Sequence, residues 1–245
     1  LVAVMAAGPL LRWRRDNPRT LLNRISIPIL ITAASLFALA LFTTGMSILS
    51  LLGMGLAAGV AIASFAPLWK RNLRRTPMHT YGMVIAHFGI AVALVGMASE
   101  ASFTEEKLVA ATPGDEIVVN NWKLKFEAIE PVAGPNWTAL ESRITAQYGD
   151  GALHPINPQN RMFAAAQTQT SEAALLTRWN GQLYVVLGDG DSEGRWQIRA
   201  WWKPFVTLIW YGGILVALGG LLAMVGRLRR GYKQRKQREF AEAML

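Results

Sequence analysis

The chain has 245 residues, of which 52% are hydrophobic, and it contains no cysteine. Lys and Arg together number 25 and Asp and Glu 16, so the formal net charge is +9. The absence of cysteine excludes disulfides, thiolate metal centres and a cysteine nucleophile within this chain. The length would allow one or two soluble domains. However, most apolar residues lie in four uncharged blocks, each near the roughly 18 residues that suggest a membrane span. The sequence predicts a polytopic α-helical membrane protein.

The first eleven residues are apolar and carry no basic leader. At 1.5 Å per residue they are too short to cross a bilayer, and they lack the charged start of a signal peptide. We interpret residues 1–11 as the remnant of a transmembrane helix that begins outside this chain. Residues 12–24 follow as a basic loop.

Residues 25–99 are expected to form three transmembrane helices. A polar segment of about 100 residues then precedes a last apolar block and a basic tail. Pro28, Pro77 and Pro204 lie near predicted helix starts, where proline costs little. The predicted spans are 25–43, 46–69, 81–99 and 204–225, with an outer domain at 100–203 and a tail at 226–245.

Basic residues predict the orientation of these spans. Five basic residues lie in 12–24, four in 70–75 and seven in the tail, whereas residues 100–200 hold 13 acidic and 8 basic residues. The positive-inside rule places the three basic segments in the cytoplasm and the outer domain on the opposite side of the membrane. The net charge is therefore a signal of topology, and it does not indicate a nucleic-acid-binding protein.

The outer domain is predicted to be β-rich. Residues 122–128 alternate apolar and polar side chains, as in a half-buried strand. Turn residues occur at 112–115 and 120–121, and a hairpin loop is expected at 189–191. Further strands are expected at 138–148, 183–187 and 195–201, and a short helix at 172–176. This pattern is typical of a small sandwich or barrel.

His87 is the first candidate site residue. An ionisable side chain within an apolar span is costly and indicates a function by default. A neutral imidazole is a common iron ligand, and two of them hold a b-type haem. The alternative is a neutral histidine that packs against a neighbouring helix. Small residues at 82, 86, 89, 93 and 96 form a stripe for close helix packing, and His87 is expected on an adjacent face.

The other histidines do not complete a metal site with His87. His79 lies eight residues earlier, about 12 Å along a helix, and His154 is expected in an outer loop. We therefore expect this chain to supply one axial haem ligand only. Serine, histidine and carboxylate residues show no catalytic spacing, and no residue is predicted to be catalytic. Aromatic residues near the last span are expected to form an interfacial belt, and they comprise Trp196, Trp201, Trp202, Phe205, Trp210 and Tyr211.

Several segments resemble the CcmF-type cytochrome c haem lyase family. The segment around His87 resembles a helix of that family, and Trp202-Lys-Pro-Phe-Val206 with Ala217-Leu-Gly-Gly-Leu-Leu222 resembles its last helix. Shorter similarities lie at Gly8-Pro-Leu-Leu-Arg12, Gly134-Pro-Asn-Trp137 and Ser171-Glu-Ala-Ala174. The order is kept along the chain, and the resemblance implies the C-terminal portion of a longer protein.

The resemblance implies a role in cytochrome c maturation at the bacterial inner membrane, with the outer domain in the periplasm. Proteins of this family take haem from the chaperone CcmE and, with CcmH, promote its thioether attachment to apocytochrome c. They also hold a transmembrane haem b. The position of one of its axial ligands matches His87, and the other ligand belongs to a helix outside this chain. The implied activity is that of a haem lyase (holocytochrome c synthase) subunit.

Three alternatives remain at this point. The paralogue NrfE serves the maturation of a nitrite reductase, and the segments above do not separate it from CcmF. A non-catalytic membrane scaffold would use His87 for packing only. A transporter would place charged groups within its spans, and none is present there. One departure from the family concerns a Lys-Arg-aromatic run, which reads Gln159-Asn-Arg161-Met-Phe163 here.

Overall fold

The protein is described by a computed structural model that covers residues 18–43, 45–69 and 71–242. It divides into a helical unit, within 1–102 and 208–245, and a second unit at 103–207 that is built of strands. The predicted helix remnant at 1–11 and the first part of the basic segment lie outside the described residues.

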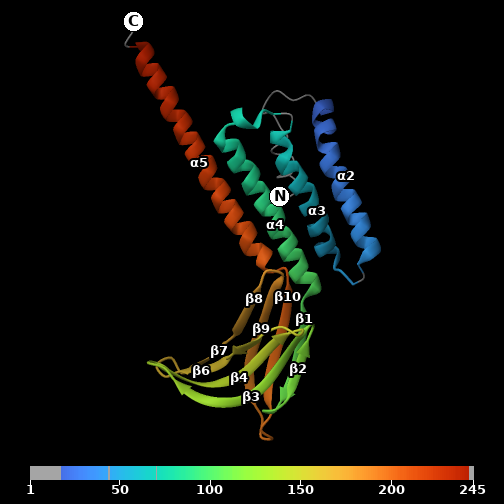
Figure 1. Ribbon diagram of the computed structural model, residues 1–245, viewed down its shortest axis with the longest axis vertical. Coiled ribbons are helices and arrows are strands. Elements are labelled where there is room, and N and C mark those ends of the chain that lie inside the picture. Colours follow the sequence, from blue (N-terminus) through green and yellow to red (C-terminus); the bar gives the residue numbers. More distant parts are fainter. Residues whose placement is uncertain (1–17, 44, 70, 243–245) are drawn as a thin grey trace. The chain divides into compact units, whose positions relative to one another are not determined.

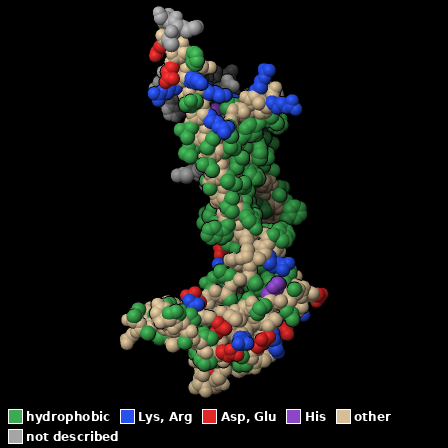
Figure 2. All heavy atoms as spheres, turned by 60° about the vertical axis from the view of Figure 1, so that its left-hand side comes forward, with side chains coloured by type: hydrophobic (Ala, Val, Ile, Leu, Met, Phe, Trp, Pro, Cys, Tyr) green, Lys and Arg blue, Asp and Glu red, His purple; other side chains and the backbone are tan. Residues whose placement is uncertain are grey.

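The helical unit contains four helices that are long and apolar enough to cross a membrane. This confirms the predicted number of full spans. Figure 2 shows hydrophobic side chains along these helices and Lys and Arg side chains at one end of them. The helices are α2 (Pro18–Phe42), α3 (Ile48–Phe65), α4 (Met78–Phe103) and α5 (Thr207–Glu242).

Two helices extend into segments that we expected to be irregular. α2 begins at Pro18, so its first turns lie within the basic segment 12–24. α5 continues through the basic tail to Glu242. Lys, Arg, Gln and Glu are good helix formers, and Arg235 pairs with Glu239 one turn later at 3.1 Å. The basic residues therefore did not indicate where these helices begin or end.

Glycines bring α4 and α5 into close contact along their length. A Cβ atom added to Gly82 would lie 2.4 Å from the backbone nitrogen of Ala223, and one added to Gly89 would lie 2.7 Å from the carbonyl oxygen of Gly212. A Cβ atom added to Gly219 would lie 2.5 Å from the backbone nitrogen of Ala86. We call this contact the glycine seam, formed by Gly82, Gly89 and Gly96 of α4 with Gly212, Gly219 and Gly226 of α5.

The other helix contacts use larger side chains as well as glycine. The ring centroids of Phe65 on α3 and Phe88 on α4 lie 5.4 Å apart. A Cβ atom on Gly59 of α3 would overlap the hydroxyl of Thr32 on α2, which itself donates to the Pro28 carbonyl. Small residues thus support each of these neighbouring helix pairs, as is usual in membranes.

The second unit is a sandwich of two antiparallel sheets (Figure 1). One sheet has the order β1-β10-β9-β8, formed by Glu105–Ala111, Trp196–Pro204, Gly181–Gly190 and Ala174–Arg178. The other has the order β2-β3-β4-β6-β7, formed by Glu116–Val119, Trp122–Ala133, Trp137–Tyr148, Gln159–Phe163 and Thr168–Glu172. β5 (Leu153–Ile156) pairs with the last part of β4.

Alternating side chains fill the space between the two sheets. On β3, Trp122, Leu124 and Phe126 are buried while the lysines between them are exposed. Leu183 and Leu187 on β9 are buried in the same way. This period of two is the pattern from which the strand at 122–128 was predicted. The apolar core of the sandwich therefore follows directly from the sequence.

The structure confirms the predicted strands at 122–128, 138–148 and 183–187 within longer strands, and the strand predicted at 195–201 begins at Trp196 and continues to Pro204. The predicted helix at 172–176 is wrong, because this segment contains the end of β7 and the start of β8. Ala174 and Leu176 pack against the sandwich core, and β8 pairs with β9. Pairing with β9 and burial of Leu176 outweigh the weak local preference for helix.

The predicted aromatic belt is only partly right. Trp202 is a core residue of the sandwich, and Trp196 pairs with Ala111 at the far end of β10. Trp210 and Tyr211, in the first turn of α5, are exposed, as expected for an interfacial position. The prediction grouped these aromatic residues because they are close in sequence. A strand rises about 3.3 Å per residue, so Trp196 and Trp202 lie far apart along β10.

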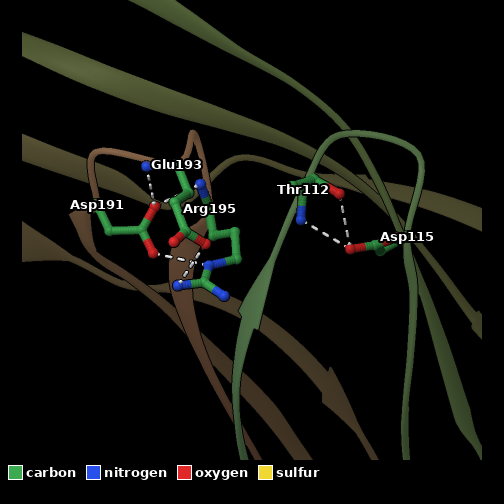
Figure 3. Close-up of polar contacts among 5 residues, drawn as sticks. All are labelled: Thr112, Asp115, Asp191, Glu193 and Arg195. Atoms are coloured by element: carbon green, nitrogen blue, oxygen red, sulfur yellow. Dashed lines mark hydrogen bonds and ion pairs between the residues drawn. The ribbon is translucent and has the colours of Figure 1, made fainter.

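Two turns lie where β1 and β10 pair at one end of the sandwich (Figure 3). Asp115 accepts hydrogen bonds from the backbone and hydroxyl of Thr112 at 2.7 and 3.0 Å. Asp191 accepts from the amides of Glu193 and Arg195 and from the Arg195 guanidinium. These donors, led by the backbone amides, hold the pKa of both carboxyls below the ordinary value. The predicted turn at 112–115 is confirmed, whereas the hairpin loop predicted at 189–191 lies later, between the end of β9 at Gly190 and the start of β10 at Trp196.

Replacement of Asp191 should loosen the β9–β10 hairpin only where the wild-type carboxyl is ionised. Its lowered pKa means that the stabilisation is complete above the unfolded value of about 3.9 and is lost as the pH falls through the lower folded value. In Asp191→Asn, hydrogen exchange across 188–196 should be faster than in wild type at pH 7, and the difference should vanish at low pH. Asp150→Asn, in another turn, serves as the control. Equal exchange at pH 7 would contradict this assignment.

The glycine seam predicts opposite effects for adjacent glycines of α5. Gly212→Ala or Gly219→Ala would place a methyl group against the α4 backbone and should cost about 1–3 kcal/mol of stability. Gly213→Ala and Gly220→Ala are the matched controls, because nothing lies within 4 Å of an added Cβ there. Thermal unfolding in detergent should therefore show a lower Tm for the first pair only. A similar Tm for all four variants would refute the close contact.

Candidate functional site

His87 lies on α4, nine residues after the helix begins at Met78. This is about 13 Å along the helix axis, within a span free of acidic and basic side chains up to Ser99. The imidazole Nδ1 lies 2.9 Å from the backbone carbonyl of Met83, one turn earlier. A carbonyl can only accept a hydrogen bond, so Nδ1 carries the proton. In the neutral imidazole the lone pair then resides on Nε2.

The half-buried His87 lies on a different face of α4 from the glycine seam. His87 is two positions before Gly89, a rotation of about 200°, and one position after Ala86, a rotation of about 100°, so it lies on a face of α4 turned away from the α5 contact. Phe88, the next residue, contacts α3. Met83, Ile90 and Leu94 share the His87 face and are only half-buried among the described residues.

His79 lies two turns before His87 on α4, as predicted, whereas His154 lies on a strand of the sandwich and not in the expected outer loop. His79 is in the first turn of α4, where its backbone approaches Gly226 of α5. His154 is half-buried on β5 and pairs with Ala146 in the sandwich. Within the described residues, no group of three or more His, Cys, Asp or Glu side chains could hold a metal ion. His87 thus remains a single potential ligand.

Three separate sequence segments meet on one face of the sandwich. The Arg161 guanidinium of β6 stacks over the Trp137 ring of β4 at 4.3 Å and pairs with Glu172 of β7 at 3.4 Å. Gly134 makes this possible, because an added Cβ would lie 2.3 Å from the Trp137 ring. We call these three side chains the Trp137 stack. It involves Gly134-Pro-Asn-Trp137, Ser171-Glu-Ala-Ala174 and the segment in which Arg161 replaces the expected run.

A groove of about 920 Å³ lies on the other face of the same strands. Its apolar lining includes Leu140, Met162 and Trp196. At its edge, Gln169 on β7 donates a hydrogen bond to Asp189 on β9 at 3.2 Å, which links the two sheets. Sequence reasoning missed this groove, because its walls come from strands that are distant along the chain.

The Trp137 stack predicts an energetic coupling between Arg161 and Trp137. A double-mutant cycle of Arg161→Ala and Trp137→Ala should give about 0.5–1 kcal/mol, the usual value for a partly exposed cation–π contact. Chemical denaturation of the full chain in detergent measures it. Arg143→Ala, whose side chain pairs with Glu130 instead, is the control and should show no coupling with Trp137. A zero value for Arg161 as well would contradict the stack.

Residues 102–204 match the family model described as the CcmF C-terminal beta-sandwich. The chain is 32% identical over 224 residues to "Cytochrome c-type biogenesis protein CcmF" of Escherichia coli (strain K12), covering 90% of this chain and 35% of that protein. It is 30% identical to "Cytochrome c-type biogenesis protein CycK" of Rhizobium meliloti (strain 1021), covering 98% of this chain and 38% of the relative.

A solved structure has the same fold. The chain superposes on "Cytochrome c Heme Lyase CcmF" with a TM-score of 0.71 at 20% identity, covering 91% of this chain and 38% of that one. The chain thus spans a little over a third of the length of the proteins it matches. These similarities extend over both the helices and the sandwich, and they show that the chain belongs to the CcmF family of cytochrome c-type biogenesis proteins.

Proposed function

We propose that this chain is part of a haem lyase that attaches haem covalently to apocytochrome c, and that His87 is an axial ligand of a b-type haem within the membrane. The observation that carries the proposal is the hydrogen bond from His87 Nδ1 to the Met83 carbonyl. In the neutral imidazole it leaves the Nε2 lone pair free inside an apolar span, which is the form of histidine that binds iron.

The surroundings of His87 fit a haem. Among the described residues no hydrogen-bond partner is found for Nε2, so iron would not compete with an existing contact. The apolar side chains beside it, those of Met83, Ile90 and Leu94, suit the edge of a porphyrin. A haem with two imidazole ligands would supply reversible one-electron chemistry at its iron. The second ligand is proposed to come from the part of the protein that this chain does not include.

The chain's own residues would orient the ligand. A metal-binding histidine usually donates its other N–H to a carbonyl or carboxylate, which fixes the ring and raises the basicity of the ligating nitrogen. The Met83 carbonyl supplies that acceptor here. The glycine seam would hold α4 against α5 on another face and so keep the His87 face in one position.

We propose an orientation with the sandwich in the periplasm and the basic segments in the cytoplasm of a bacterial inner membrane. Arg71, Arg74 and Arg75 precede α4, and Arg227 begins the basic part of α5. Both segments therefore belong on the cytoplasmic side by the positive-inside rule. α4 and α5 then place the sandwich between them on the periplasmic side, where apocytochrome c is matured.

Partners are proposed from the family alone. CcmE would deliver haem, CcmH would act together with this protein, and apocytochrome c would be the acceptor. The groove lined by Leu140, Met162 and Trp196 is a surface of suitable character for a protein partner. The NrfE role in nitrite reductase maturation stays an alternative of the same class, and maturation assays with the two acceptors would separate them.

The proposal is tested on the full-length protein that contains this chain. Reduced-minus-oxidised spectra of His87→Ala should lose nearly all of the b-type α band, because one axial ligand is removed. His79→Ala is the matched control, since His79 lies on the same helix about 12 Å away and should leave the band intact.

Protein yield and Tm are compared so that misfolding is detected separately. An unchanged α band in His87→Ala, at normal protein level, would make His87 a packing residue and would favour the scaffold alternative.

A further inference from the structure

Trp179 is a strongly exposed aromatic side chain of the sandwich. It lies between β8 and β9 with 74% of its surface accessible. An exposed tryptophan is costly in water, and one next to a membrane span is typical of the lipid headgroup region. The sequence alone does not indicate that Trp179 lies near a membrane span, because it precedes the start of α5 by 28 residues.

Hydrogen bonds tie this turn to the first residue of α5. The Trp179 carbonyl accepts from the Thr207 hydroxyl at 3.1 Å, and the Asn180 carbonyl accepts from the Phe205 amide at 2.8 Å. Thr207 is almost completely buried, with 3% of its surface accessible. Gly181 permits this approach, because an added Cβ would lie 2.7 Å from the Lys203 carbonyl oxygen.

The position of Thr207 relative to the bilayer follows from the length of the apolar stretch. Residues 207–226 carry no charged side chain, and Arg227 follows directly. Twenty helical residues span about 30 Å, the thickness of the hydrocarbon core. Thr207 therefore marks one edge of that core when α5 crosses the membrane. The exposed Trp210 and Tyr211 in the first turn agree with this boundary.

The backbone at the junction supports the same interpretation independently. Phe205 adopts a left-handed conformation with φ of 57°, which is unfavourable for a bulky side chain. Its ring is 41% exposed. A glycine would adopt this conformation without strain. The presence of a phenyl group at this strained position therefore indicates that an exposed aromatic side chain has a function here.

We propose that the Trp179 turn, comprising Arg178–Asn180, is an interfacial anchor of the sandwich in the lipid headgroup layer, with Phe205 beside it. The partner is the bilayer itself. Arg178 supports the turn from within the sandwich, where its guanidinium stacks on the Tyr148 ring at 4.5 Å. The anchor would fix the sandwich close to the membrane surface from which α5 departs.

The absence of native cysteine in this chain allows a direct test. A nitroxide is attached to Trp179→Cys in the full chain, reconstituted in vesicles of phosphatidylethanolamine and phosphatidylglycerol. Power-saturation EPR compares collisions with oxygen, which concentrates in lipid, and with a water-soluble nickel chelate. Glu193→Cys, in the exposed β9–β10 turn, is the control.

The label at 179 should show a several-fold higher ratio of oxygen to nickel accessibility than the label at 193. An equal ratio at the two positions would place the turn in water and overturn the proposal. Protection of the 179 label from both reagents would show that protein covers the turn, which also overturns it. A nitroxide at Phe205→Cys, the other exposed position of the proposed anchor, repeats the comparison if Trp179→Cys folds poorly.

Discussion

The helical unit depends on the absence of side chains where α4 meets α5. Gly82, Gly89 and Gly96 are spaced seven residues apart, as are Gly212, Gly219 and Gly226. A spacing of seven keeps one face of each helix directed at its partner. Because the backbones are in contact, even a methyl group has no room. In a bilayer, where the hydrophobic effect does not drive helices together, this close packing is the main source of association.

The glycine seam also limits which faces of α4 can bind a ligand. One face is fully used against α5, and Phe88 and Ala98 contact α3. His87, with its apolar neighbours, lies on the face that remains. The hydrogen bond from Nδ1 to the preceding turn then selects the nitrogen that can bind iron. The packing against α5 thus limits the faces of α4 that remain accessible, and one local hydrogen bond orients the His87 ring.

The sequence predicted the features that depend on apolar composition and periodicity. Four apolar blocks, a stripe of small residues and the alternation at 122–128 correspond to the helices, the seam and a core strand. Features that depend on distant pairing were missed. The segment 172–176 is strand because β9 and β6 are available to pair with it, and Trp196 and Trp202 lie at opposite ends of one strand. Neither fact is encoded locally.

The Trp137 stack shows how separate motifs become one feature. The similarity to the CcmF family includes Gly134-Pro-Asn-Trp137 and Ser171-Glu-Ala-Ala174, and the departure from that family lies at Gln159-Asn-Arg161-Met-Phe163. Antiparallel pairing of β4, β6 and β7 places Trp137, Arg161 and Glu172 in one contact. A stack of this kind holds the edge strands in register, and it forms the back of the groove lined by Leu140 and Met162.

The central claim is that His87 Nε2 is a ligand to haem iron, and chemical rescue tests it most directly. In the full-length protein, His87→Gly leaves a space that free imidazole can occupy. The account predicts that the variant loses the low-spin EPR signal of its b-type haem and that added imidazole restores it. A low-spin signal that persists in His87→Gly without imidazole would contradict the account, because another residue would then be the ligand.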